Sequence, residues 1–183
     1  LYNNCKLVFI DCDSSLLIDI EKVKNFIEHE TYYKNVNSYN KKTKKRVLSI
    51  IVVHVFGNLV NLNKEFVKFC NSRNINIIED AAESLGSKYL KSKKQPSTVG
   101  DIGCLSFNGN KILTSGGGGM LVFKKKAHYN YGKYLSNQSK NDSINFIHNE
   151  VGYNFRLSNL HAAIGNAQLK YFKKILQKKR SIH

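Results

Sequence analysis

The residues most able to do chemistry lie at 106–119, where a lysine is followed by four consecutive glycines. The stretch reads SFNGNKILTSGGGG, with Lys111 in its middle and Ser106 before it. Two apolar segments that are typical of β-strands, 102–107 and 119–123, flank it. A glycine run lets the backbone pass close to a bulky group. A lysine near a phosphate-binding hydroxyl suggests a Schiff-base lysine that holds pyridoxal phosphate.

Two plainer explanations of this stretch stay open on the residues alone. A glycine run can be a flexible loop, and a glycine-rich loop with a lysine could bind the phosphates of a nucleotide. The order of the residues disfavours the nucleotide, because the glycines of a P-loop precede GK[ST] and the loop opens a helix. Here Lys111 precedes the glycines, and a predicted strand follows them.

A second polar stretch follows the apolar segment 75–78. It reads EDAAES and contains Glu79, Asp80 and Glu83. Ligands of open α/β sheets gather beyond the carboxyl ends of parallel strands. There Asp80 could pair with the pyridinium nitrogen of pyridoxal phosphate and keep it protonated, which makes the ring a better electron sink. The alternative is that Asp80 only caps the next helical turn.

The segments around these residues predict strands and helices in alternation. We expect strands at 6–10, 47–53, 75–78, 102–107 and 119–123, helices at 19–29, after Asn63, at 127–135 and at 158–179, and a polar surface loop at 31–46. The nearly continuous apolar run at 47–53 is typical of a parallel strand covered on both faces. Short strand–helix–strand connections predict a three-layer α/β/α fold with a mostly parallel central sheet.

Composition and cysteine usage argue against several classes of function. The net charge of +16 could indicate a basic nucleic-acid-binding module, but the lysines are scattered in small groups without a recognised binding motif. The four cysteines stand singly, without a CxxC pair or a histidine at metal-ligand spacing, so we expect no metal site and a reducing cytoplasm. No apolar stretch approaches the roughly 18 residues that suggest a membrane span. We expect neither nucleic acid nor membrane as a partner.

Five stretches together resemble the DegT-type family of sugar-nucleotide aminotransferases, which share the aspartate-aminotransferase fold. They are VFIDCD near the start, VVHVFGN at 52–58, IIEDAAESLGSKY at 77–89, GDIGCLSFNGNKILTSGGGGM at 100–120 and GYNFRLSNLHAAIGNAQL at 152–169. They follow the family order through almost the whole chain. FNGNK and the four glycines are most similar to the branch that makes legionaminic acid and related bacillosamine-type amino sugars.

The resemblance implies a role for each candidate residue. Lys111 would be the Schiff-base lysine, Asp80 the partner of the pyridinium nitrogen, and Ser106 a ligand of the cofactor phosphate, all three at one cavity. Asn154 corresponds to an asparagine that reaches the phosphate in the neighbouring subunit, which implies a homodimer with shared sites. Glu83 stands where many members have glutamine beside the ring hydroxyl, so its role is open.

The implied reaction is a transamination in two stages. Glutamate is the expected amino donor, and a nucleotide-linked keto sugar for a cell-surface or flagellar glycan is the expected acceptor. Lys111 would move the proton as general acid and base. A dehydratase of the same fold is the rival enzyme; some relatives replace the lysine with histidine and become dehydratases, so Lys111 argues against it. A catalytically silent relative of the same fold and a nucleic-acid-binding module are two further rivals.

We expect the sequence to be a central fragment. It begins at Leu1 and ends while a helical pattern is still running. The resemblance places a Gly-Thr pair and a ring-stacking aromatic residue upstream, and a small C-terminal domain downstream. Residues 1–183 would therefore form part of the large, cofactor-binding domain and would not catalyse alone.

Overall fold

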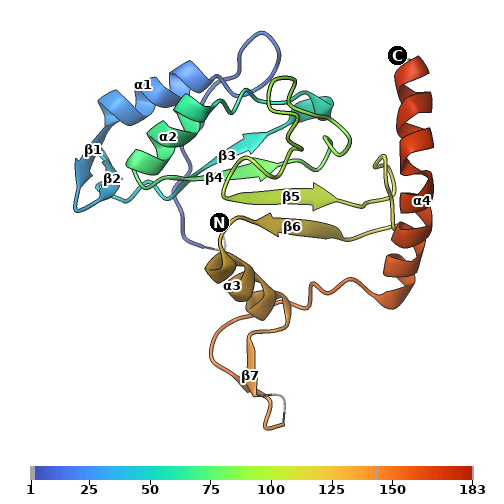
Figure 1. Ribbon diagram of the computed structural model, residues 1–183. Helices are drawn as coiled ribbons and strands as arrows, with labels where there is room; N and C mark the ends of the chain where they lie inside the picture. Colours follow the sequence, from blue (N-terminus) through green and yellow to red (C-terminus); the bar gives the residue numbers. More distant parts are fainter. Residues whose placement is uncertain (1–2, 143, 183) are drawn as a thin grey trace.

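A four-stranded sheet lies at the centre of the computed structural model, which describes residues 3–142 and 144–182 (Figure 1). The strands follow the order β3-β4-β5-β6, which are Ser49–Val53, Asn76–Asp80, Ile102–Ser106 and Gly119–Phe123. Strands β3, β4 and β5 are parallel, whereas β6 is antiparallel to β5. The expected α/β fold with a mostly parallel sheet is confirmed.

Two helices cover one face of this sheet and build the core. Helix α1 (Ile20–Glu30) begins after Asp19 and α2 (Lys64–Ser72) after Asn63; both preceding side chains accept hydrogen bonds from the first turn, which satisfies amide groups that the helix cannot pair. Their apolar sides meet β3 and β4 in a buried cluster that includes Val23, Ile27, Val52, Phe66, Cys70 and Ile77. The core therefore lies between this helical layer and the sheet.

The opposite face of β3 is open among the described residues. Val52 is fully buried, but its neighbours Ile51 and Val53 are 56% and 42% exposed. Successive side chains of a strand point to opposite faces, so only the face of Val52 meets α1 and α2. The run at 47–53, interpreted from its sequence as covered on both faces, is covered on one in this part of the chain.

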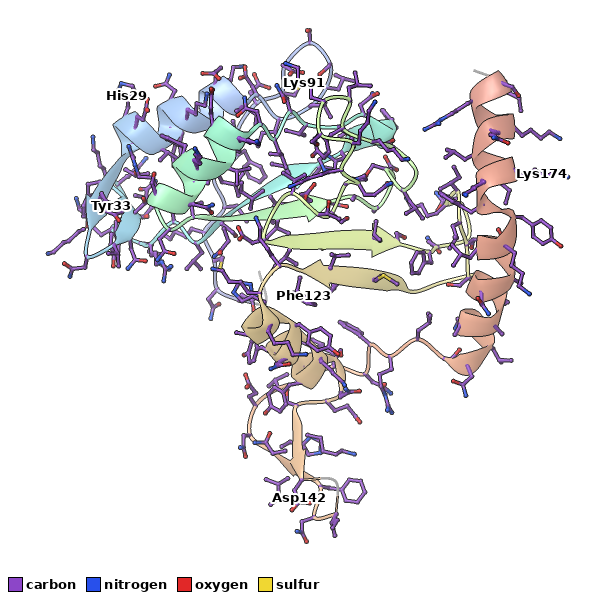
Figure 2. All side chains as sticks on the ribbon, viewed as in Figure 1. His29, Tyr33, Lys91, Phe123, Asp142 and Lys174 are labelled. Carbon is purple, nitrogen blue, oxygen red and sulfur yellow. The ribbon has the colours of Figure 1, made fainter. Side chains whose placement is uncertain are left out.

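The last two helices lie near the other strands. Helix α3 (Lys126–Ser136) follows β6, and the long α4 (Asn159–Ile182) stands beyond the carboxyl ends of β4 and β5 (Figure 1). Among the described residues, no helix is both long and apolar enough to cross a lipid bilayer. The lysines are spread over separate parts of the chain, as Lys91 in the connection between β4 and β5 and Lys174 in α4 illustrate (Figure 2).

Two expectations for the N-terminal part were wrong. Residues 6–10 form no strand, and Leu7, Val8 and Phe9 are exposed; a strand needs a neighbour that pairs its backbone groups, and the described residues supply none there. The expected loop at 31–46 contains an antiparallel hairpin of β1 (Thr31–Lys34) and β2 (Asn37–Asn40).

Two hairpins in the described part of the chain were unexpected. Between β1 and β2, Asn35 and Val36 both have positive φ, as a two-residue turn of type I′ requires, and the rings of Tyr32 and Tyr39 stack across the strands at 5.6 Å. A second, irregular hairpin, β7 (Lys140–Asp142) with β8 (Ile147–His148), follows α3.

Candidate functional site

Asp80 and Ser106 lie at the same edge of the sheet. Asp80 is the last residue of β4 and pairs in register with Cys104 of the parallel strand β5. Ser106 ends β5, and its hydroxyl accepts a hydrogen bond of 3.3 Å from the amide of Asn108. The carboxyl ends of parallel neighbouring strands meet at one edge, so these two polar side chains come from adjacent strand ends.

Lys111 lies in a turn immediately beyond β5. Its amide donates to the carbonyl of Asn108 at 3.1 Å, which closes the turn. The base of the same loop is closed by two further backbone bonds, from Ser115 to Phe107 and from Phe107 to Gly118, both 3.0 Å long. The backbone therefore holds the lysine beside the strand that carries Ser106.

The structure brings Lys111 to Glu83. The Lys111 ammonium Nζ lies 3.5 Å from Glu83 Oε1, and the amide N–H of Phe56 donates to Glu83 Oε2 at 2.9 Å. The Phe56 hydrogen bond and the nearby Lys111 charge lower the pKa of Glu83 against the opposing effect of burial. Glu83 is thus an ionised carboxylate that contacts both the lysine loop and the turn after β3.

Asp80 also makes the local contact that a capping residue makes. Its Oδ1 accepts a hydrogen bond of 3.1 Å from the amide of Ala82, so the capping explanation describes a real interaction. The cofactor roles of Asp80, Ser106, Lys111 and Glu83 stay predictions. A single cavity that joins these four residues also stays a prediction. Two surface hollows, of about 300 Å³ at α1 and about 500 Å³ at β6, are lined by other residues.

The glycine run packs against the protein itself. Gly116 and Gly118 have φ of 82° and 86°, where side chains with a Cβ are disfavoured. A Cβ on Gly118 would overlap the side chain of Leu157, and one on Gly119 would lie 2.5 Å from the carbonyl oxygen of Leu105. The glycines therefore make room for β5 and for the segment that leads into α4.

Asn154 lies apart from the other candidate residues. It forms an isolated antiparallel bridge with Asn137, in the connection between α3 and α4. Among the described residues, no hydrogen bond joins its side chain to Asp80, Glu83, Ser106 or Lys111. Its role at a neighbouring subunit's site stays a prediction.

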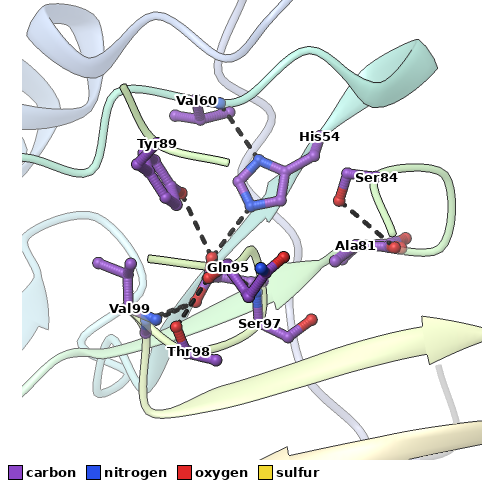
Figure 3. A network of polar contacts seen from close by, with 12 residues as sticks. His54, Val60, Ala81, Ser84, Tyr89, Gln95, Ser97, Thr98 and Val99 are labelled. Atoms are coloured by element: carbon purple, nitrogen blue, oxygen red, sulfur yellow. Dashed lines mark hydrogen bonds and ion pairs between the residues drawn. The ribbon is translucent and has the colours of Figure 1, made fainter. Parts of the chain in front are cut away.

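The sequence did not predict a buried polar network around Glu79, whose partners His54, Tyr89, Ser97 and Val99 are labelled in Figure 3. Its fully buried carboxylate accepts hydrogen bonds from His54 Nε2 at 3.1 Å, Tyr89 Oη at 3.3 Å, and the amides of Ser97, Val99 and Gly100 at 3.1, 2.8 and 2.6 Å. The amide of Val60 donates to His54 Nδ1 at 3.2 Å, so Nε2 carries the proton given to Glu79. One carboxylate fastens the segment 97–100 to β4 next to Asp80.

The environment of Glu79 explains how a charge can be buried there. Burial alone would raise the pKa of Glu79, but the hydrogen bonds from His54, Gly100 and Val99 lower it overall. The sequence held one signal for this network: Glu79 has the same strand parity as Ile77, which faces the core. An acid at a core-facing position requires several donors, although no pattern in the sequence names them.

Most of the chain is similar in sequence to known aminotransferases. EpsN of Bacillus subtilis (strain 168), named as a pyridoxal phosphate-dependent aminotransferase, is 40% identical over 134 residues, which are 73% of this chain and 34% of that protein. The GDP-perosamine synthase of Escherichia coli O157:H7 is 36% identical over 155 residues, covering 85% of this chain and 42% of the enzyme. The chain thus spans less than half the length of either relative.

A solved structure shows the same fold. The DegT DnrJ EryC1 StrS aminotransferase from Brucella abortus superposes with a TM-score of 0.76 at 23% identity, over 91% of this chain and 42% of that one. The model of the DegT/DnrJ/EryC1/StrS aminotransferase family matches residues 1–183. With a match from end to end and relatives well above 30% identity, the chain belongs to the DegT/DnrJ/EryC1/StrS aminotransferase family.

Proposed function

We propose that this chain is the cofactor-binding part of a pyridoxal phosphate-dependent aminotransferase that acts on a nucleotide-linked keto sugar in amino-sugar biosynthesis. The observation that carries the proposal is the position of Lys111. A short loop brings its amine within 3.5 Å of Glu83, in the turn that follows Asp80 at the end of β4. A lysine, a carboxylate and a hydroxyl, from Lys111, Asp80 and Ser106, are thus supplied by neighbouring strand ends.

These groups fit the chemistry of the cofactor. The Ser106 hydroxyl is a hydrogen-bond donor suited to a phosphate, and a Cβ added to Gly109 in the following turn would meet nothing within 4 Å. The Asp80 carboxylate would hold a proton on the ring nitrogen. When bound, pyridoxal phosphate supplies an electron sink for the carbon that loses its proton. The Lys111 amine would carry that proton, because one flexible amine can reach both exchanging positions.

The proposed substrates are glutamate as amino donor and a nucleotide-linked keto sugar as acceptor. The relative from Escherichia coli is named for GDP-perosamine, and a relative 34% identical over 141 residues, from Campylobacter jejuni (strain 81-176), is named as a transaminase of a UDP-linked aminosugar. The legionaminic acid and bacillosamine-type branch is the finer assignment, and it rests on the wording FNGNK and the four glycines.

The proposal includes a homodimer in the cytoplasm. Asn154 lies in the connection between α3 and α4 rather than beside Lys111, which suits a residue that acts on a neighbouring subunit's site. The four cysteines are free thiols, as in a reducing compartment.

Cofactor colour and nitrogen transfer test this function in the full-length protein. With pyridoxal phosphate the protein should be yellow, and glutamate should bleach the visible absorption band that gives this colour. Nitrogen from isotopically labelled glutamate should then appear in the sugar product. A dehydratase would release a product without that nitrogen, whereas a nucleic-acid-binding module or a silent relative would show neither colour change nor product.

A further inference from the structure

Glu83 joins two segments that are far apart in the sequence. Its Oε2 accepts a hydrogen bond from the amide of Phe56, in the turn after β3, and its Oε1 faces the ammonium of Lys111, in the loop after β5. The two oxygens of one carboxylate are thus directed to different partners. The Lys111 side chain is the more enclosed of the pair, at 18% exposure against 43% for Glu83.

The turn after β3 fixes the position of this carboxylate. Phe56 has a φ of 53°, a left-handed conformation that is unusual for a bulky aromatic residue, and its ring is exposed. The next residue, Gly57, has a φ of 83°, and its carbonyl accepts a hydrogen bond of 2.8 Å from the hydroxyl of Ser87. Backbone that is held in an uncommon conformation by several contacts is often found at functional sites.

The ion pair is suited to being exchanged. The Phe56 amide and the Lys111 charge lower the pKa of Glu83, so the carboxylate is ionised at neutral pH. Ion pairs that water reaches contribute little to folding stability because solvent screens them. A contact of this kind can orient a side chain and still release it to a stronger partner.

We propose that Glu83 is a positioning residue for Lys111: its carboxylate, fixed by the Phe56 amide, holds the lysine ammonium at the strand ends until the cofactor binds there. This inference rests on the proposed function for the identity of the cofactor. The contact between Glu83 and Lys111 itself does not depend on it. Glu83 acts through Lys111, so its removal changes the behaviour of that lysine more than that of the rest of the protein.

Competitive labelling of lysines by acetic anhydride tests the proposal in the full-length protein without cofactor. Peptide mapping by mass spectrometry gives the rates at Lys111 and Lys24, each relative to a model amine added to the same reaction. Glu83→Gln keeps an acceptor for the Phe56 amide but removes the charge, and Glu83→Ala removes both. We expect both variants to raise the Lys111 rate several-fold, because the amine is then no longer held against the Glu83 carboxylate and can reach the anhydride.

The matched control is Glu21→Gln, which removes the partner of Lys24 at 2.7 Å. It should raise the rate at Lys24 and leave the rate at Lys111 unchanged. Equal Lys111 rates in the wild type and in both Glu83 variants would overturn the positioning role. A general rise at all lysines would do so as well, because it would indicate loosened folding.

A second arm adds pyridoxal phosphate and separates this inference from the proposed function. Pyridoxal phosphate should protect Lys111 from acetylation in the wild type and in Glu83→Gln, and the visible band should develop faster in the variant. If pyridoxal phosphate does not protect Lys111 while the Glu83 variants still accelerate labelling, the cofactor assignment is wrong and the positioning of Lys111 by Glu83 is supported. If protection occurs but the labelling rates do not respond to Glu83, the positioning role alone is wrong.

Discussion

At the scale of the residue, two adjacent acids have separate tasks. Glu79 and Asp80 follow each other in β4, so their side chains point to opposite faces of the sheet. Glu79 faces the core and is fully buried among donors, whereas Asp80 is partly exposed on the other face, in register with Cys104. The carboxylate of Glu79 holds the surrounding backbone, and Asp80 lies at the strand end where the proposed function places the ring nitrogen of the cofactor.

Asp80→Asn should retain some cofactor and lose most turnover. The amide keeps the size and the contact with Ala82, but it cannot stabilise the positive ring nitrogen that draws electrons during proton transfer. Steady-state kinetics of the full-length enzyme, with cofactor content determined in parallel, would measure this. Near-normal turnover at equal cofactor content would show that Asp80 is only a cap.

In Glu79→Gln, the free energy of unfolding should fall less steeply with decreasing pH than in the wild type. Hydrogen bonds from His54, Gly100 and Val99 lower the pKa of Glu79 in the folded protein relative to the unfolded chain. Its contribution is therefore fully present above the unfolded pKa and is lost as the pH falls through the folded pKa. Urea unfolding between about pH 5 and pH 3 should show a shallower decline for the variant than for the wild type. Glu28→Gln, at an exposed position, is the control. Equal pH dependence of the free energy of unfolding in Glu79→Gln and the wild type would contradict the lowered pKa of Glu79.

The sequence was sufficient to locate the candidate residues but not their supports. Lys111, Asp80 and Ser106 could be proposed as candidates because each lies at or just beyond the end of an apolar strand, and such strand ends meet at one edge. The network of Glu79 could not be found, because its donors come from residues 54 and 89–100 and depend on how the chain folds back. The same holds for the contact of Glu83 with Phe56, which depends on a left-handed turn.

At the scale of the element, β5 and its neighbouring loop are packed without room for a side chain. A Cβ on Gly103 would overlap the Cβ and backbone of Ser97. Ser97 belongs to the segment that Glu79 fastens, so the buried carboxylate and the glycine hold the same loop against the sheet. This contact supports the strand whose end carries Ser106.

Gly103→Ala should lower the free energy of unfolding by roughly 1–3 kcal/mol, as is typical when a packed site receives an extra methyl group. Gly109→Ala is the matched control, because a Cβ there meets nothing within 4 Å. Urea titrations of the two variants would measure the difference. Equal stabilities would mean that the loop at Ser97 moves aside without cost.

Elements were predicted well where a segment carries its own pattern. Helix α1 was expected at 19–29 and runs from Ile20 to Glu30, because apolar spacing and the cap at Asp19 both act locally. The strand expected at 6–10 failed because strands depend on partners elsewhere in the chain. The hairpin β1–β2 was missed because its residues are polar and its turn uses Asn35 and Val36 rather than glycine.

At the scale of the whole molecule, the chain offers parts of a site that the proposed homodimer would complete. Lys111 and Asn154 are contributed by different regions, and the proposal assigns them to opposite subunits of one site. Two-fold symmetry then gives two identical sites per dimer. Such an arrangement predicts that two inactive variants, each with a substitution at a different residue of the shared site, complement each other in a mixed dimer.

Co-expression of Lys111→Ala and Asn154→Asp full-length chains should restore activity that neither variant has alone. One site of each mixed dimer would carry both defects and the other would carry none, so the mixed dimer should have about half of the wild-type activity. Activity of the purified mixed dimer would measure this. No recovery in verified mixed dimers would show that Asn154 does not act across subunits.

The covalent attachment of pyridoxal phosphate to Lys111 is the most direct test of the account. The full-length protein would be saturated with the cofactor, reduced with borohydride to make the linkage permanent, digested and mapped by mass spectrometry. We predict that the pyridoxyl group is found on Lys111 and is lost in Lys111→Ala. Modification of a different lysine, or no modification of a protein that is shown to be folded, would contradict the central claim.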